Sequence, residues 1–134
     1  MADDTLARRL SAQLLPGESA TDPVAVAERL LAIQAQDPRG ARLAVRARTT
    51  GLTATDVDRA LTEERSLLVT WLNRGTLHLV RSEDYGWLHA LTTPPLHTAN
   101  ATRLAQEGVT PAAAERGVAT IERALATEGP VTRP

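Results

Sequence analysis

Cysteine, lysine and phenylalanine are absent from this sequence of 134 residues. The lack of cysteine excludes a disulfide framework, a thiolate zinc site and a cysteine nucleophile. A chain of this length buries roughly two-thirds of its unfolded surface, so one domain needs no such links for stability. A net charge is also nearly absent, because 15 arginines are balanced by 16 acidic residues, and this excludes a uniformly basic nucleic-acid binder.

Long apolar runs are missing as well, and so are motifs for metal ligands, phosphate-cradling loops and serine nucleophiles. The first residues carry acids and arginines with no apolar segment behind them, so they form neither a secretory signal peptide nor a membrane span. We therefore predict a cytoplasmic protein with no membrane partner. The exclusive use of arginine, with abundant alanine, leucine and threonine, is typical of a GC-rich bacterial genome and is no sign of selection for phosphate binding.

Helix signals dominate the first half of the chain. Aliphatic residues recur at spacings of three and four, and the Pro-Gly pair at residues 16–17 ends the first helix. Asp22 and Asp37 each precede a proline, as an N-cap precedes the first helical residue. Thr53 with Asp56 resembles a capping box. The predicted helices span residues 5–15, 23–36, 38–49 and 54–64.

A different pattern follows these helices. Residues 66–72 and 76–80 are rich in leucine, valine and threonine, and the Asn-Arg-Gly sequence at 73–75 suits a three-residue loop with a left-handed glycine. Together these features predict an antiparallel hairpin. Proline and capping signals then predict further helices that begin after Ser82, at Pro94 and at Pro111.

The order of helices followed by a hairpin predicts a mainly α fold with a small antiparallel β-hairpin, an α+β class. It is the order of a winged helix-turn-helix, in which the hairpin is the wing. Residues 1–81 would form a first winged-helix domain, and residues 82–134 a helical connector leading to a truncated second winged helix. Many small α+β domains also end a run of helices with a hairpin, so this pattern leaves other folds open. The end of the sequence places a proline where another helix would start, and we expect the chain to be the front of a longer protein.

Positive charge is concentrated in the middle of the chain. Residues 39–81 carry a net charge of +4, whereas the segments before and after them carry −3 and −2. Arg39, Arg42 and Arg46 recur at spacings of three and four, which places them on one helix face. Beside a basic hairpin that contains Arg74, such a face suits contacts with phosphates. The alternative is an ordinary solvated face whose arginines pair with nearby acids.

Two glutamines stand near the predicted end of the second helix. Pro38 disfavours the α conformation at Asp37, so that helix should end near Gln36. Gln34 and Gln36 would then converge on one cleft near the hairpin and hold a water molecule between their amides. The competing interpretation is that both residues only decorate a helix end. Asp37 needs no catalytic role, because it caps the following helix. His78 is explained by a surface or cross-strand position in the hairpin.

Several stretches together resemble the winged-helix DNA glycosylases of the AlkZ and YcaQ type. The matching parts are residues 34–38 (QAQDP), 46–48 (RAR) and 71–80 (WLNRGTLHLV), with Asp84 and Trp87. The resemblance covers nearly the whole chain. The family's catalytic motif is Gln, an apolar residue, then Gln or Asp. This sequence has the Gln-x-Gln form, which is associated with resistance to self-made DNA-alkylating antibiotics.

The resemblance implies a monofunctional DNA glycosylase, a hydrolase acting on alkylated purines or unhooking interstrand crosslinks. Its partners would be double-stranded DNA and the remaining winged-helix domains of the same longer chain, with no metal or organic cofactor. Gln34 and Gln36 would position water and stabilise the cationic sugar. The implied DNA-binding residues are Arg39, Arg42, Arg74, Thr76 and His78.

Two other hypotheses remain open at this point. A non-enzymatic winged-helix DNA-binding module or transcription regulator would place the third helix in the major groove and would usually dimerise. Alternatively, the chain is a folding unit with no activity alone. A glycosylase predicts amides that converge in a concave site, whereas a regulator predicts an exposed recognition helix with side chains that fit base edges.

Overall fold

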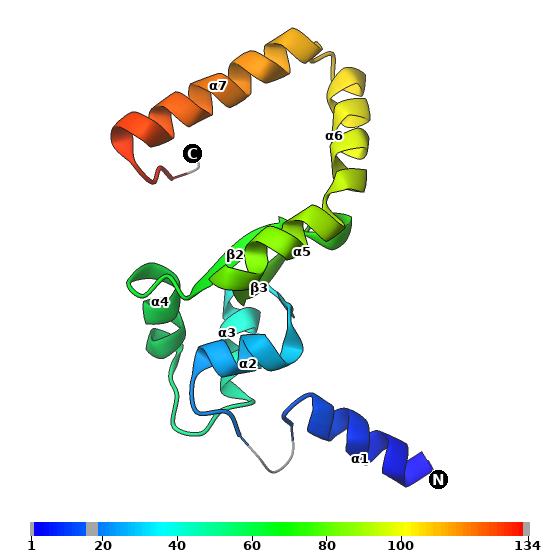
Figure 1. The fold of residues 1–134 in the computed structure, drawn as a ribbon, viewed down its shortest axis with the longest axis vertical. Helices are drawn as coiled ribbons and strands as arrows, with labels where there is room; N and C mark the ends of the chain where they lie inside the picture. Colours follow the sequence, from blue (N-terminus) through cyan, green and yellow to red (C-terminus); the bar gives the residue numbers. More distant parts are fainter. Residues whose placement is uncertain (1, 16–18, 133–134) are drawn as a thin grey trace. The chain divides into compact units, whose positions relative to one another are not determined.

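The computed structural model describes residues 2–15 and 19–132 and divides into two compact units, Met1–Thr93 and Pro94–Pro134 (Figure 1). The predicted end of the first helix at residues 16–17 lies outside the described residues. The helices of the first unit are α1 (Ala2–Ala12), α2 (Pro23–Leu30), α3 (Pro38–Arg46), α4 (Ala54–Thr62) and α5 (Tyr85–Thr92). Its strands are β1 (Ile33–Gln34), β2 (Leu67–Leu72) and β3 (Thr76–Arg81).

The three strands form one antiparallel sheet in the order β1-β3-β2. The predicted hairpin is confirmed, because β2 and β3 pair along their whole length and are joined by the turn η1 (Asn73–Gly75). Gly75 has the predicted left-handed backbone, with φ of 73°. Arg74 also adopts it, with φ of 55°, so the tip holds a non-glycine residue in a conformation that costs free energy.

The predicted helix over residues 23–36 is wrong in its second half. α2 ends at Leu30, Leu31 has a φ of 66°, and the chain then extends into β1. Beyond β1, the N–H of Ala35 donates to the carbonyl of Leu77 over 2.8 Å, which prolongs the pairing with β3. The sequence did not predict this third strand because it is very short and is stabilised by its partner strand rather than by its own propensity.

The other helix predictions are confirmed with shifted ends. Asp22 and Asp37 cap α2 and α3 with their side chains, and the predicted capping box begins α4. α1, α3 and α4 each end a few residues before the predicted position. Ser82 does not cap a helix as predicted: its hydroxyl donates to the carbonyl of Arg65 over 2.6 Å, and the turn η2 (Ser82–Asp84) precedes α5.

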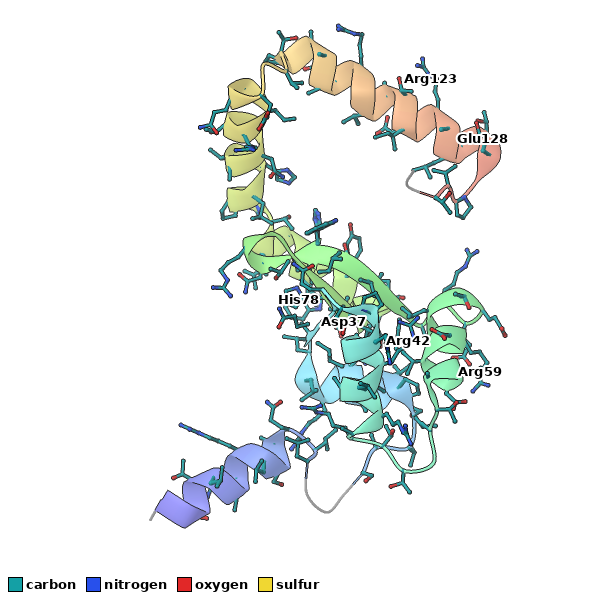
Figure 2. The ribbon with its side chains drawn as sticks, turned by 180° about the vertical axis from the view of Figure 1, so that it is seen from behind. Asp37, Arg42, Arg59, His78, Arg123 and Glu128 are labelled. Atoms are coloured by element: carbon teal, nitrogen blue, oxygen red, sulfur yellow. The ribbon has the colours of Figure 1, made fainter. Side chains whose placement is uncertain are left out.

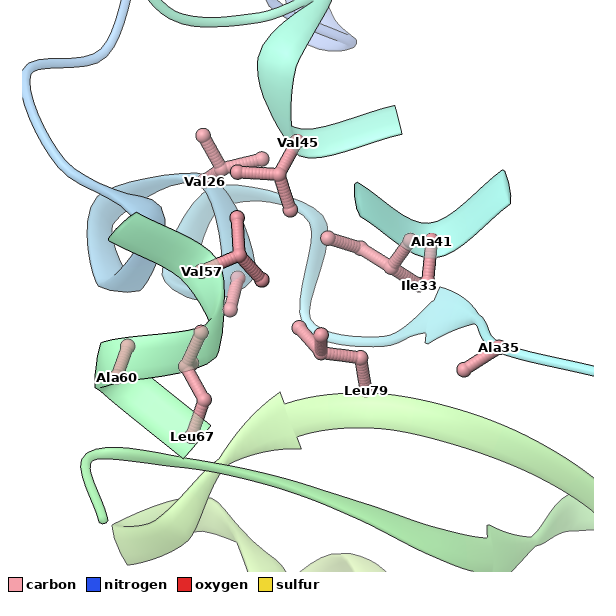
Figure 3. Close-up of a cluster of buried hydrophobic side chains, with 10 residues drawn as sticks. Val26, Ile33, Ala35, Ala41, Val45, Val57, Ala60, Leu67 and Leu79 are labelled. Atoms are coloured by element: carbon pink, nitrogen blue, oxygen red, sulfur yellow. The ribbon is translucent and has the colours of Figure 1, made fainter. Parts of the chain in front are cut away.

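Two hydrophobic clusters lie on opposite faces of the sheet, because side chains alternate along each strand. On one face, which we call the helical face, strand residues pack against α2, α3 and α4 (Figure 3). The buried residues of this cluster are Val26, Ala27, Ile33, Ala35, Ala41, Val45, Val57, Ala60, Leu67 and Leu79. On the opposite face, Leu72 and Val80 pack with Leu88 of α5.

The arrangement of the first unit is that of a winged helix. A helix and a short strand (α2-β1) precede the helix-turn-helix pair α3-α4, and the β2-β3 hairpin follows as the wing. The predicted α+β class is therefore confirmed. The first compact unit continues past Arg81, because α5 packs on β2. The predicted division into residues 1–81 and 82–134 stays a prediction.

The second unit consists of α6 (Pro94–Gln106) and α7 (Pro111–Glu128). Both helices begin at the predicted prolines. The Thr110 hydroxyl accepts a hydrogen bond from the N–H of Ala113 over 3.3 Å, and Gly129 ends α7 with a φ of 75°. No helix in the described parts of the chain has the length and apolar content needed to cross a membrane.

A buried carboxylate joins the hairpin to α5. Asp84, only 9% exposed, accepts hydrogen bonds from Arg81 Nε at 2.7 Å and from Trp87 Nε1 at 3.0 Å. The Arg81 guanidinium, followed by the Trp87 indole, holds the pKa of Asp84 below its usual range, while burial opposes this shift. Arg81 also forms ion pairs with Glu83 and with Glu28 of α2. This network anchors the base of the wing to α2 and α5.

We expect Asp84→Asn to lower the free energy of unfolding by about 2 kcal/mol at pH 7, because charge-assisted hydrogen bonds to Arg81 are lost. The lowered pKa means that Asp84 stabilises the fold fully above its unfolded pKa of about 3.9 and progressively less as the pH falls through the lower folded value. Urea denaturation of both proteins at several pH values should show the difference shrinking below about pH 4. Glu83→Gln is the matched control, since Glu83 contacts the same arginine from an exposed position. A pH-independent difference for Asp84→Asn would contradict the assignment.

Candidate active site

Gln34 and Gln36 lie on the same side of an extended segment. Ile33 and Ala35 alternate with them and are buried in the core, whereas both glutamines are exposed. A spacing of two residues places side chains on one side of an extended chain. The early end of α2 therefore removes the geometry that would have separated them. Within the described parts of the chain, neither side-chain amide has a hydrogen-bond partner.

His78 is the direct cross-strand neighbour of Gln34 in the β1-β3 pairing. Its Nδ1 lies 2.9 Å from the carbonyl oxygen of Thr76. A carbonyl oxygen only accepts hydrogen bonds, so Nδ1 carries the hydrogen and donates it. In the neutral imidazole, Nε2 then keeps its lone pair and is the acceptor. The half-buried ring, labelled in Figure 2, thus has a defined tautomer beside Gln34.

Several polar side chains lie next to one another on the sheet face opposite the helical face. Thr70 pairs with His78 on the other side, so Gln34, His78 and Thr70 form a row across the three strands. Thr76 lies on the same face, and the register continued from β1 places Gln36 across from it. We call the face that carries these five residues the amide face. Sequence reasoning missed Thr70, although strand alternation within the predicted hairpin register would have found it.

A hollow of about 210 Å³ lies beside Gln34 and is also lined by Gln13, Ala44 and Arg48. The guanidinium of Arg48 donates from Nε to the carbonyl of Gln13 over 2.8 Å, which ties the segment after α1 to the segment after α3. Gln36 does not line this hollow. The convergence of both amides on a single cleft therefore stays a prediction.

Asp37 has a structural task in this segment. Its carboxylate accepts hydrogen bonds from the backbone N–H of Arg39 at 3.0 Å and of Gly40 at 3.1 Å, so it caps α3 directly after the glutamines. A Cβ at Gly40 would lie 3.1 Å from a carboxylate oxygen of Asp37, so glycine there leaves room for the cap. The cap occupies the carboxylate and holds the start of α3 against the end of the Gln34–Gln36 segment.

The three arginines predicted on one helix face do share a face. Arg39, Arg42 and Arg46 line a hollow of about 160 Å³ together with Leu43 and the start of α4. Arg42 Nε donates to Asp58 over 2.7 Å, and its Nη1 donates to the Pro38 carbonyl over 2.8 Å (Figure 2 labels Arg42). Arg42 thus links α3 to α4. This contact agrees with the alternative interpretation, in which the arginines of a solvated face pair with nearby acids.

The other residues predicted to contact phosphates are not paired with a carboxylate as Arg42 is. Arg39 is exposed on α3 and Arg74 is exposed at the hairpin tip. Neither side chain has a partner among the described residues. Thr76 is less available, because its hydroxyl donates to the Asn73 carbonyl over 3.2 Å inside the hairpin. The DNA-binding roles of these residues stay predictions, and Arg39 and Arg74 are the better placed of them.

α4 occupies the position of the second helix in the helix-turn-helix, yet its polar residues are mainly acidic. Asp56 and Asp58 lie on it with one arginine, Arg59. The Arg59 guanidinium is held by Asp56 at 2.9 Å and by Glu64 at 3.1 Å (Figure 2 labels Arg59). These contacts raise the pKa of Arg59, and the Thr53 cap bonds lower that of Asp56. This helix has no free positive charge for DNA phosphates.

The wing, the helix-turn-helix and the amide face define a winged-helix protein, and comparison with known proteins identifies its family. The family model of AlkZ-like DNA glycosylases matches residues 27–134, and the chain belongs to this family. Among solved structures, the chain is similar to the DNA glycosylase AlkZ of Streptomyces sahachiroi, with 30% sequence identity and a TM-score of 0.63. The similarity covers 81% of this chain and 29% of that chain. No curated protein sequence matches the chain.

The capping role of Asp37 is testable with two substitutions. Asp37→Ala should lower the free energy of unfolding by about 1 kcal/mol, because two backbone N–H groups lose their acceptor. Asp37→Asn should remain close to the wild type, because an asparagine oxygen caps equally well. Thermal denaturation of both variants measures this. Equal destabilisation by alanine and asparagine would show that the charge of Asp37, rather than the cap, is what matters.

Proposed function

We propose that this chain is the catalytic winged-helix part of a DNA glycosylase that hydrolyses the N-glycosidic bond of alkylated purines. The observation that carries the proposal is the amide face, where Gln34 pairs with His78 and both glutamines lack side-chain partners among the described residues. Membership of the AlkZ-like DNA glycosylase family supports it. Excision of a crosslinked purine, which unhooks an interstrand crosslink, is the same bond cleavage on a larger substrate.

The chemistry suits neutral amides. A purine alkylated at N7 is positively charged and leaves without strong acid catalysis, so the barrier lies at the oxocarbenium-like sugar. The amide oxygens of Gln34 and Gln36 would stabilise that developing positive charge, since oriented dipoles act strongly in a preorganised site. Their N–H groups would orient the attacking water. Asp37 would take no part, because its carboxylate is committed to the cap of α3.

His78 adds a hydrogen-bond acceptor to this arrangement. In the neutral ring its Nε2 keeps a lone pair, because the Thr76 carbonyl holds the hydrogen on Nδ1. A water molecule held by Gln34 would donate to this nitrogen, so His78 would align the lone pair of the water oxygen with the sugar. The resulting pair of contacts defines the direction of attack better than an amide alone.

The arginines that form no ion pair with a carboxylate would hold the DNA. Arg39 and Arg74 fit this role, and Arg42 would first have to leave Asp58. Because the chain covers 29% of the AlkZ structure that it matches, we propose that further winged helices of the same longer chain complete the DNA-binding surface.

A non-enzymatic regulator is the alternative, and one observation weighs against it. A regulator of this fold would insert the second helix of its helix-turn-helix into the major groove. In this protein that helix is α4, whose charged residues are Asp56, Asp58 and an arginine, Arg59, that is already bound to Asp56 and to Glu64 beyond the helix. Carboxylates facing phosphates would weaken binding.

We expect Gln34→Ala and Gln36→Ala each to slow excision of N7-alkylguanine by roughly 10- to 100-fold in the complete protein. Affinity for the same DNA should stay within about twofold, because the amides act on the transition state. Excision is measured as abasic sites in single-turnover assays, and affinity by fluorescence anisotropy.

Gln106→Ala on α6 is the matched control for these two variants, since it removes an exposed amide far along the chain from the amide face. Wild-type excision by both Gln34→Ala and Gln36→Ala would refute the catalytic role. A loss of affinity equal to the loss of rate would instead make the glutamines DNA-binding residues.

We also expect DNA binding by residues 1–134 alone to be weak and strongly dependent on salt, because the net charge is −1 and the basic excess of residues 39–81 is only +4. Arg39→Ala and Arg74→Ala should each lower the slope of log Kd against log salt concentration by about one. Arg59→Ala is the control, because its guanidinium is already bound to Asp56 and Glu64. Duplex titrations at several salt concentrations test this, and tight binding that ignores salt would contradict it.

A further inference from the structure

The helical face of the sheet is covered only at one end. Along β2, Leu67, Val69 and Trp71 all point to this face by strand alternation. Leu67 is 1% exposed, but Val69 is 42% and Trp71 is 54% exposed. The helices therefore cover the start of β2 and leave its second half, toward the hairpin tip, as open apolar surface. The exposed indole and the exposed valine together form an apolar patch on this face of the sheet.

This open end adjoins an apolar hollow of about 220 Å³. Its lining residues are Ala35, Pro38, Ala41, Arg42, Leu61, Val69, Leu77 and Leu79. Trp71 does not line the hollow itself, but it pairs directly with Leu77 and shares a strand face with Val69, both of which do. Ala35 lines the hollow while its chain neighbours Gln34 and Gln36 point to the amide face. Residues 34–36 thus contribute both to the lining of the hollow and to the candidate catalytic amides, on opposite faces of the sheet.

The unpaired charge near this surface is positive. Arg42 lines the hollow but is paired with Asp58, whereas Arg74 lies three residues beyond Trp71 with no partner among the described residues. Aromatic side chains beside free arginines are the combination with which proteins bind unpaired nucleic acid, the ring stacking on a base and the arginine meeting a phosphate. An apolar protein partner would leave the charge of Arg74 without a counterpart.

We propose that Trp71 stacks on an unpaired nucleobase of the bound DNA, beside the lining residues Val69 and Leu77, with Arg74 at a neighbouring phosphate. The proposal rests on the proposed function, since it takes DNA as the ligand. Bases inside an intact duplex are covered by their neighbours, so the indole meets only a base that has left the stack. The surface therefore favours DNA that is locally unpaired over fully paired DNA.

The protein contains two tryptophans, which makes stacking directly observable. Trp87→Phe leaves Trp71 as the sole fluorophore, and Trp71→Phe leaves Trp87, which is similarly exposed at 47% but lies on α5. Each variant is titrated with a duplex that carries one central unpaired thymine and with the fully paired duplex. We expect quenching of Trp71 by the first duplex at least about twofold stronger than by the second, and no such difference for Trp87.

Affinity gives the second readout. Trp71→Ala should weaken binding of the unpaired-base duplex roughly tenfold and leave binding of the paired duplex within about twofold, while Trp71→Phe should largely restore it. Circular dichroism confirms that each variant is folded. Equal quenching of both tryptophans, or equal loss of affinity for both duplexes, would overturn the proposal. The proposal would also be overturned if Trp71→Ala reduced self-association of the protein but left its binding of both duplexes unchanged.

These outcomes are independent of excision. Failure of the stacking test with normal release of N7-alkylguanine would reject the role of Trp71 and leave the glycosylase proposal intact. Specific Trp71 quenching without any excision would support the stacking site and reject the glycosylase proposal.

Discussion

The pairing of β1 with β3 is the interaction on which both the core and the candidate site depend. Ile33 across from Leu79 completes the larger hydrophobic cluster, and Gln34 across from His78 brings an amide beside an imidazole. A shift of one residue would exchange the two faces of β1, which would bury the glutamines and expose Ile33 and Ala35. The hydrophobic effect acting on Ile33 and Ala35 therefore determines where the polar site residues point.

So short a strand stays extended because the chain is constrained on both sides. Leu31, with its positive φ of 66°, ends α2 abruptly, and the Asp37 cap with Pro38 starts α3 immediately after Gln36. Between these two points the segment has just enough length to pair with β3 and turn into α3. The arrangement links stability to function, because the residues that end and begin the helices also hold the amides on the surface of the sheet.

Local signals in the sequence predicted the parts of the fold that local interactions stabilise. Caps at Asp22 and Asp37 located the starts of α2 and α3, and alternating residues around Asn73–Gly75 located the wing. The same signals failed at β1, because its stability comes from a partner strand more than forty residues away in the chain. For the site, the motif identified Gln34 and Gln36, but only the register shows that they share a face with His78. The ion pair of Arg42 with Asp58 was equally hidden, since it joins two helices.

Under the proposed function, the distribution of free and paired charges decides which surface DNA would approach. The carboxylates of α4 neutralise Arg42 and Arg59, so these two arginines add little to the attraction of a phosphate backbone. The arginines that remain unpaired among the described residues of this region include Arg39, at the first turn of α3, and Arg74, at the tip of the wing. A backbone that follows these charges passes the hairpin and the start of α3 instead of lying along α4. That path runs beside the Gln34–Gln36 segment, because α3 begins directly after it, and it would bring a glycosidic bond to the amides rather than a base edge to a recognition helix.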